Sequence, residues 1–100
     1  FTPKLNVSKS GRATAPYTAV DSQGNPTLVW QEFTGNIGSD IFFSSSNNRG
    51  QSFATITNIS GNSGSSLFPT ATFDSNNMLF VGWNDDSSAN SEIFISSTPK

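Results

Sequence analysis

The feature that most constrains this chain is an internal repeat. A shift of 53 residues places Trp30 on Trp83, and a shift of 52 places the segment DIFF on EIFI. Other landmarks follow in the same order with two single-residue gaps. Self-similarity at a period of about 50 residues is typical of solenoids, propellers and related repeat architectures. We therefore interpret the chain as two repeats, residues 1–52 and 53–100.

Each repeat contains short segments with the composition of β-strands and no convincing helix. They are rich in β-branched and aromatic residues, and turn clusters such as DSQGNP and DSNN separate them. The expected strands are residues 1–8, 17–20, 27–33, 40–45, 53–60, 70–73, 78–83 and 92–97. The chain then begins with a fourth strand, continues with one full set of four, and ends with strands one to three of another set.

The second strand of the first repeat predicts how the sheets are covered. Leu28, Val29 and Trp30 are apolar in succession, whereas a half-solvated strand alternates apolar and polar residues. Four-stranded antiparallel sheets repeated every 40 to 50 residues or so are the signature of propeller blades. We expect an all-β fold of two four-stranded β-propeller blades, with Trp30 and Trp83 packed between blades.

The order of the strands predicts an assembly. Residues 1–8 are expected to close a blade begun by another terminus, in a circular permutation. Two blades cannot close a ring, because propellers have typically four to eight. The expected partners are other copies of the chain, as a trimer giving six blades or a tetramer giving eight. The alternative is that both blades belong to a longer single-chain propeller.

Residues 46–53, SNNRGQSF, resemble the Asp-box of bacterial-neuraminidase-type repeats, whose pattern is Ser-x-Asp-x-Gly-x-Thr-Trp. An Asx side chain can accept backbone N–H bonds within such a turn, and glycine supplies positive φ. In that family the element joins strands three and four and lies away from the ligand face. The resemblance implies a structural role here for Ser46, Asn48, Gly50, Ser52 and Phe53.

The same resemblance bears on catalysis. Sialidase-type propellers use an arginine triad and a tyrosine–glutamate pair, but this chain contains only Arg12, Arg49 and the single tyrosine Tyr17. We therefore expect no enzyme activity. The predicted function is a non-catalytic propeller module for ligand binding or assembly, with lectin-like carbohydrate binding as the candidate activity. The alternative is a catalytically empty fragment of a sialidase-like glycosidase.

A candidate ligand site follows from the strand directions, which place one set of loops opposite the box. These loops carry Arg12, Glu32, Asp85 and Asp86, a mixed-charge rim of the kind that binds sugars or Ca²⁺ through oxygen atoms. The plainer interpretation is that they are solvated loops. Without Cys or His the usual zinc and copper ligands are missing, and we expect no cofactor and no metal centre.

Two further pairs of polar residues recur through the repeat. Asp21 and Asp74 begin the turns DSQG and DSNN, where an Asx side chain bonds its own backbone, so we predict turn formers instead of metal ligands. The triplets Asn-Val-Ser at 6–8 and Asn-Ile-Ser at 58–60 match the N-glycosylation pattern. Because the repeat itself makes them recur, we expect sheet-edge residues.

Charge and composition exclude some partners. A net charge of -2 with only five Lys and Arg provides no basic stripe for nucleic acid or an anionic membrane. No apolar run approaches the roughly 20 residues of a membrane span. Abundant small polar residues and the lack of Cys favour an extracellular or cell-surface protein.

Overall fold

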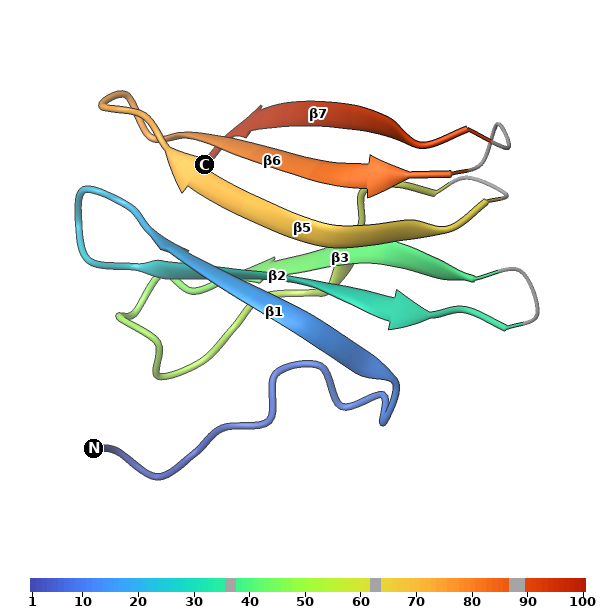
Figure 1. Cartoon of the computed structure of the whole chain (residues 1–100). Helices are drawn as coiled ribbons and strands as arrows, with labels where there is room; N and C mark the ends of the chain where they lie inside the picture. Colours follow the sequence, from blue (N-terminus) through green and yellow to red (C-terminus); the bar gives the residue numbers. More distant parts are fainter. Residues whose placement is uncertain (36–37, 62–63, 87–89) are drawn as a thin grey trace.

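The computed structural model describes residues 1–35, 38–61, 64–86 and 90–100. In this part of the chain the strands form two antiparallel sheets, and no helix is present. Sheet A has the order β1 (Ala13–Val20), β2 (Pro26–Phe33), β3 (Ser39–Ser45) and β4 (Thr57–Asn58). Sheet B has the order β5 (Ser66–Phe73), β6 (Met78–Asp85) and β7 (Glu92–Pro99). Figure 1 shows the sheets stacked as two layers, with β5 next to β1 and β2.

The all-β class is as predicted, and equivalent residues of the two repeats take equivalent places. Trp30 pairs with Phe42 across β2 and β3, and Trp83 pairs with Phe94 across β6 and β7. Both pairs stack, with ring centroids 6.5 Å and 6.3 Å apart. Such cross-strand aromatic pairs stabilise the strand pairing in both sheets.

The core lies between the two sheets. Its buried members are Ala19, Val29 and Ile41 from sheet A, and Ala71, Leu79, Val81 and Trp83 from sheet B. Alternation along each strand aims these residues at the facing sheet. Burying apolar area here stabilises the stack by roughly 25 cal/mol per Å². Trp83 therefore packs between sheets, as predicted.

Trp30 is buried in a different place. It follows Val29 on β2, so its side chain points to the outer face of sheet A, away from sheet B. Only 3% of Trp30 is exposed, because residues 5–8 lie across this face. The prediction that Trp30 is buried is confirmed, but the segment that covers it is the N-terminal one and not a second sheet.

The two hairpin turns form as predicted from their aspartates. Asp21 Oδ1 accepts the N–H groups of Gln23 and Asn25 at 2.9 Å and 2.8 Å. Asp74 Oδ1 accepts the N–H groups of Asn76 and Met78, both at 2.9 Å. The role of both aspartates as turn formers is confirmed, and it fixes the registers of β1 with β2 and of β5 with β6.

The predicted fourth strands differ from the structure. Residues 1–8 contain no strand, and residues 5–8 run across the outer face of sheet A, over Leu28 and Trp30. Of residues 53–60, only Thr57 and Asn58 form a strand, β4. The ladder is interrupted because Ser60 Oγ, a side-chain atom, accepts the Ile41 N–H at 2.9 Å.

The first strand of each sheet, β1 or β5, bends at a bulge before a proline. Ala15 and Phe68, which precede Pro16 and Pro69, have φ of 52° and 55°, and the register of each hairpin shifts at this point. Positive φ is costly for residues other than glycine. At Phe68 the bulge is held by its own N–H, which donates to Gln31 Oε1 of sheet A at 2.8 Å.

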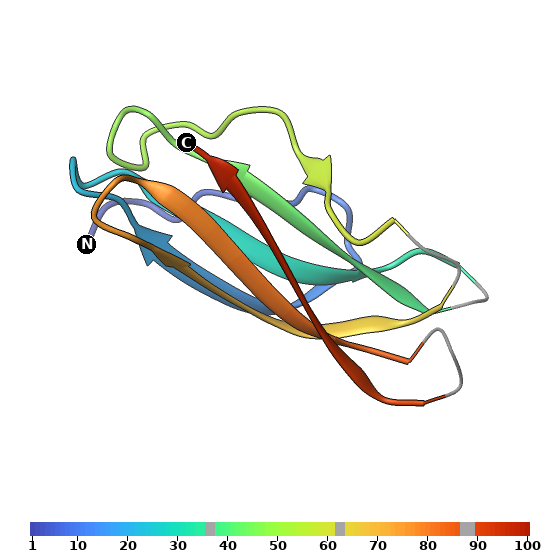
Figure 2. The same ribbon diagram turned by 90° about the horizontal axis from the view of Figure 1, so that it is seen from above.

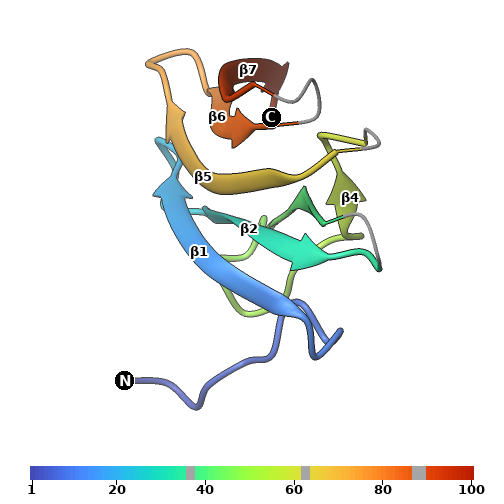
Figure 3. The ribbon, with the colours of Figure 1, turned by 45° about the vertical axis from the view of Figure 1, so that its right-hand side comes forward.

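The sheets do not close into a ring, so the propeller arrangement itself remains a prediction. Figure 2 shows the two ends of the stack: the β1–β2 and β5–β6 turns and the segment that follows β3 lie at one end, and the loops after β2 and β6 lie at the other. We call these the turn end and the loop end. Figure 3 shows β4 along the edge of sheet A and the N-terminal segment on that sheet's outer side.

Candidate functional site

The predicted rim residues lie at the loop end, but the structure divides them into buried and exposed pairs. Arg12 and Asp86 are exposed, whereas Glu32 and Asp85 are buried. Residues 36–37, 62–63 and 87–89 of the loops predicted to form the rim lie outside the described residues. Whether these side chains bind a ligand therefore stays a prediction.

Glu32 and Asp85 occupy equivalent positions and hydrogen-bond within their own sheets. Glu32 Oε1 accepts the Trp30 Nε1–H at 3.1 Å, on the outer face of sheet A. Asp85, one methylene shorter, accepts the Ser66 hydroxyl at 3.1 Å instead. The Nε1–H of Trp83 is buried and has no hydrogen-bond partner in the described part of the chain. Both carboxylates thus have structural partners.

The exposed pair is arranged by backbone contacts. Asp86 Oδ1 accepts the Ser65 N–H at 3.0 Å, and the Asp86 N–H donates to the Ser65 carbonyl at 3.1 Å. The Arg12 carbonyl accepts the Phe33 N–H at 3.3 Å, and both residues are exposed. Within the described residues, no group of three or more His, Cys, Asp or Glu side chains is placed to hold a metal ion.

The turn end contains the Asp-box-like segment. Ser46 is buried, and its Oγ accepts the N–H groups of Asn48 and Gly50 at 3.2 Å and 2.8 Å. Asn48 Oδ1 accepts the Ser52 N–H at 3.0 Å, and Gly50 has φ of 88°. The turn thus contains an Asx acceptor and a glycine with positive φ, while its identity as an Asp-box stays a prediction. Phe53 is half-buried and lies outside the core cluster between the sheets.

The box is tied to the β1–β2 turn. The Arg49 N–H donates to Asn25 Oδ1 at 2.9 Å, and Lys100 Nζ donates to the Ser46 carbonyl at 3.0 Å and to Asp21 Oδ2. The hydrogen bond from Lys100, helped by the turn N–H groups, lowers the pKa of Asp21 from 3.8 to about 2. These contacts use the polar groups of the turn end to hold the two sheets together.

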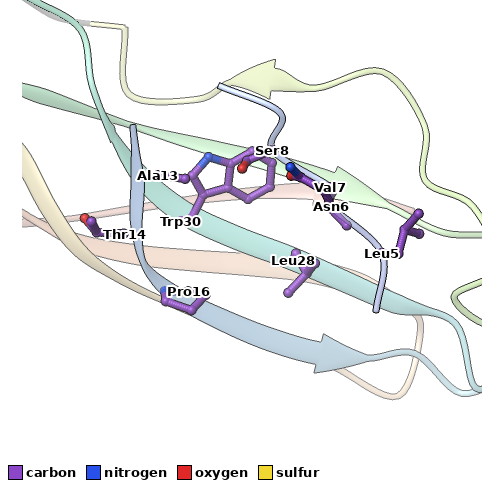
Figure 4. Close-up of a pocket in the computed structure, with 9 residues that line it drawn as sticks. All are labelled: Leu5, Asn6, Val7, Ser8, Ala13, Thr14, Pro16, Leu28 and Trp30. Atoms are coloured by element: carbon purple, nitrogen blue, oxygen red, sulfur yellow. The ribbon is translucent and has the colours of Figure 1, made fainter. Parts of the chain in front are cut away.

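The two outer faces of the stack, one on sheet A and one on sheet B, are further candidate sites for binding. Sheet A has a cavity of about 250 Å³ on its outer face, lined by Leu28 and Trp30 of β2 and by Leu5, Val7 and Ser8 of the N-terminal segment. Figure 4 shows this cavity, with the Trp30 ring between the N-terminal segment and the start of β1. Its walls are mainly apolar, so it suits side chains better than a polar ligand.

The outer face of sheet B is apolar and uncovered. Ile93 and Ile95 on β7 are 79% and 71% exposed. Their repeat equivalents on β3 are Ile41, which is fully buried, and Phe43, which packs against the core. All four residues lie in predicted strands, but strand patterns alone do not distinguish the exposed isoleucines from the buried residues. The signal that finds them is their equivalence to buried residues.

Comparisons with known proteins assign no family. No protein-family model matches the sequence, and a search of curated proteins finds no significant match. None of the described segments forms a helix long and apolar enough to cross a membrane.

Proposed function

We propose that the chain is a non-catalytic assembly module whose sheets stack with further copies into a closed β-propeller-type ring. The observation that carries this proposal is the contrast between Ile41, fully buried under sheet B, and its equivalent Ile93, 79% exposed on sheet B. An exposed apolar sheet face of this kind marks an interaction surface or an aggregation hazard.

The partner surface is present on the same chain. In the stack, the face of sheet A that bears Val29 and Ile41 receives Val81 and Trp83 of sheet B. The repeat equivalents of the receiving face are Gly82 and Ile93, and those of the inserted face are Leu28 and Trp30. Within one copy, the inner face of sheet A packs on the inner face of sheet B. Because the outer face of sheet B is equivalent to the inner face of sheet A, it can pack in the same way on the outer face of sheet A in another copy.

Charge favours the same head-to-tail arrangement. The first repeat contains four basic and three acidic residues, and the second contains one basic and four acidic residues. Stacking sheet B of one copy on sheet A of the next brings a negative unit beside a weakly positive one. Such complementarity steers association and disfavours the head-to-head arrangement.

Head-to-tail contacts are heterologous, so they either close into a ring or continue as a filament. Propeller rings hold typically four to eight sheets, and three or four copies of a two-sheet chain give six or eight. In this ring, residues 1–8 of one copy supply the fourth strand that sheet B lacks. The buried carboxylates of Glu32 and Asp85 support a non-catalytic role, because both bond to their own sheets.

The molecular mass in solution tests this proposal. Light scattering over a dilution series should give three or four times the chain mass of 10.7 kDa at the higher concentrations. A compact, folded monomer throughout the series would contradict it. A mass that grows without limit would indicate a filament in place of a ring.

Ligand binding at the loop end is the second candidate. Arg12 and Asp86 are exposed there, and so is Phe33, whose N–H donates to the Arg12 carbonyl. Aromatic faces and polar groups together are what a lectin-like site offers a sugar. A glycan array with the wild-type chain and Arg12→Ala would test this, and hydrolysis of a fluorogenic sialoside would instead favour the glycosidase alternative.

A further inference from the structure

Sheet A shows how a fourth segment is attached to the third strand of the repeat. The Ile59 N–H donates to the Ile41 carbonyl at 2.8 Å, and Phe42 pairs with Asn58. Two side chains then converge on one carboxylate. Asn58 Nδ2 donates to Asp40 Oδ2 at 2.9 Å, and the Ser60 hydroxyl donates to Asp40 Oδ1 at 3.1 Å.

We call this arrangement the carboxylate lock of sheet A, formed by Asp40, Asn58 and Ser60. Asp40 is only 8% exposed, and its two oxygens bind two donors that are two residues apart. Hydrogen bonds to an ionised carboxylate are stronger than those between neutral groups. The lock therefore specifies which residue of the attached segment lies at which position along β3.

Each residue of this lock has a repeat equivalent elsewhere in the described part of the chain, and these equivalents do not contact one another within one copy. Glu92 is the equivalent of Asp40 and lies exposed at the start of β7, while Asn6 and Ser8 are the equivalents of Asn58 and Ser60. Figure 1 shows the N-terminal segment beyond the outer side of sheet A and β7 at the far side of the stack. Both sheets thus separate Asn6 from Glu92 of the same chain.

The N-terminal segment already has the local shape of its equivalent. Asn6 Oδ1 accepts the Lys9 N–H at 3.0 Å, and Asn58 Oδ1 accepts the Gly61 N–H at 2.9 Å. Lys9 and Gly61 both have positive φ, 56° and 48°. Positive φ is unfavourable for a lysine. The N-terminal segment thus shares the Asx hydrogen bond and the positive φ of its equivalent, and it is pre-organised for attachment.

We propose that Glu92 is the receptor for Asn6 and Ser8 of a neighbouring copy, so that a second carboxylate lock fixes the N-terminal segment to β7. This inference rests on the proposed assembly and names the contact that sets its register. The Asn6 amide and the Ser8 hydroxyl donate to the Glu92 carboxylate, Leu5 lies opposite Ile95, and Asn6 lies opposite Phe94. The occupant is thus residues 1–8 of the same sequence, and not an unrelated peptide.

Cross-linking between separately labelled chains tests the register. The sequence contains no cysteine, so chains with Leu5→Cys mixed with chains with Ile95→Cys can form only the introduced disulfides. Directly opposite residues on antiparallel strands have Cβ atoms about 4.5 to 5.5 Å apart. We expect the 5–95 heterodimer to exceed, by about tenfold, the product of Leu5→Cys with the off-register Thr98→Cys.

Charge tests the lock itself on the full chain. Asn6→Asp keeps the oxygen that accepts the Lys9 N–H but places a carboxylate against Glu92, and it should weaken association about tenfold. Adding Glu92→Gln should restore association, because the new amide donates to the carboxylate at position 6. Asn76→Asp, which adds the same charge in the exposed β5–β6 turn, should change association little.

The possible results distinguish the second carboxylate lock from the proposed assembly of copies. A chain that stays monomeric overturns both. An oligomer in which the 5–95 product does not exceed the off-register control, or in which Asn6→Asp associates like Asn76→Asp, overturns the lock alone and leaves the stacking of sheet faces in place.

Discussion

Sheet A and sheet B are built from the same repeat, and they differ in what covers them. On sheet A, β4 follows the edge of β3 and sheet B covers the face that bears Ile41. On sheet B, the equivalent face with Ile93 is exposed, and β7 pairs with β6 alone among the described strands. The same local sequence thus gives a core in one place and an exposed apolar face in the other, depending on whether a neighbouring sheet covers it.

The comparison of the two tryptophans gives the largest expected effect. Trp83→Ala removes a ring from the core between the sheets and should lower the free energy of unfolding by about 3 to 5 kcal/mol. Trp30→Ala should cost less in the monomer, because the segment at residues 5–8 can move into the space. Urea denaturation of both variants measures the difference, and equal losses would mean that the two faces are covered equally firmly.

Sheet A differs from sheet B in that the Asp-box-like segment, residues 46–53, leads from β3 to the fourth strand β4. Gly50→Val forces a β-branched residue into φ of 88° and should cost about 1 to 3 kcal/mol. The nearest side-chain atom to an added Cβ is Pro26 Cγ at 3.5 Å, so the cost arises in the backbone and not from a clash.

Asn48→Asp is the matched control for that change, because it keeps the oxygen that accepts the Ser52 N–H. It should alter stability by less than about 0.5 kcal/mol. Thermal unfolding of both variants checks this pair. If Gly50→Val were as stable as the wild type, the left-handed turn would not be needed to bring β4 to β3.

A smaller effect separates the indole N–H groups of the two repeats. Trp30→Phe leaves the buried Glu32 carboxylate without its donor, whereas Trp83→Phe removes an N–H that has no partner in the described residues. The first change should therefore cost about 1 to 2 kcal/mol more than the second. Chemical denaturation of the two variants gives this difference, and the reverse order would mean that Glu32 is not stabilised by Trp30.

The smallest expected effect is the pH dependence that Asp21 gives to the stability of the fold. The pKa of Asp21 is held at about 2 by the Lys100 hydrogen bond, below its ordinary 3.8. Ionised Asp21 therefore stabilises the fold above pH 3.8, and this contribution is lost as the pH falls toward 2. Asp21→Asn should lose less stability than the wild type over this interval. Stability measured against pH gives this difference, and a profile of Asp21→Asn identical to that of the wild type would refute the role of Lys100.

Local patterns in the sequence were sufficient for the first three strands of each sheet, β1 to β3 and β5 to β7, and for the hairpins that join β1 to β2 and β5 to β6. The DSQG and DSNN turns depend on Asp21 and Asp74 bonding to backbone a few residues away, so they could be predicted from neighbours in the chain. The Asn48 acceptor in the box is local for the same reason. The burial of Trp83 followed from the apolar composition on both faces of the second strand.

Features that depend on distant contacts could not be predicted in this way. Residues 1–8 have the pattern of a strand, but a strand needs a free edge, and within the chain they cover Trp30 instead. The buried state of Glu32 depends on the indole of Trp30, and that of Asp85 on Ser66. The contact of Lys100 with Asp21 joins residues from opposite ends of the sequence, and no local signal announces it.

The central claim is that the face of sheet B bearing Ile93 is buried in solution by sheet A of another copy. The equivalent face of sheet A, which bears Ile41, is buried by sheet B of the same chain. The most direct measurement is the light-scattering mass of Ile93→Asp beside the wild type. The account predicts that the wild type forms a trimer or tetramer and that Ile93→Asp is a folded monomer, because a charge on a buried apolar face is strongly disfavoured. If Ile93→Asp had the same mass and the same thermal transition as the wild type, the exposed face would be no interface and the account would be wrong.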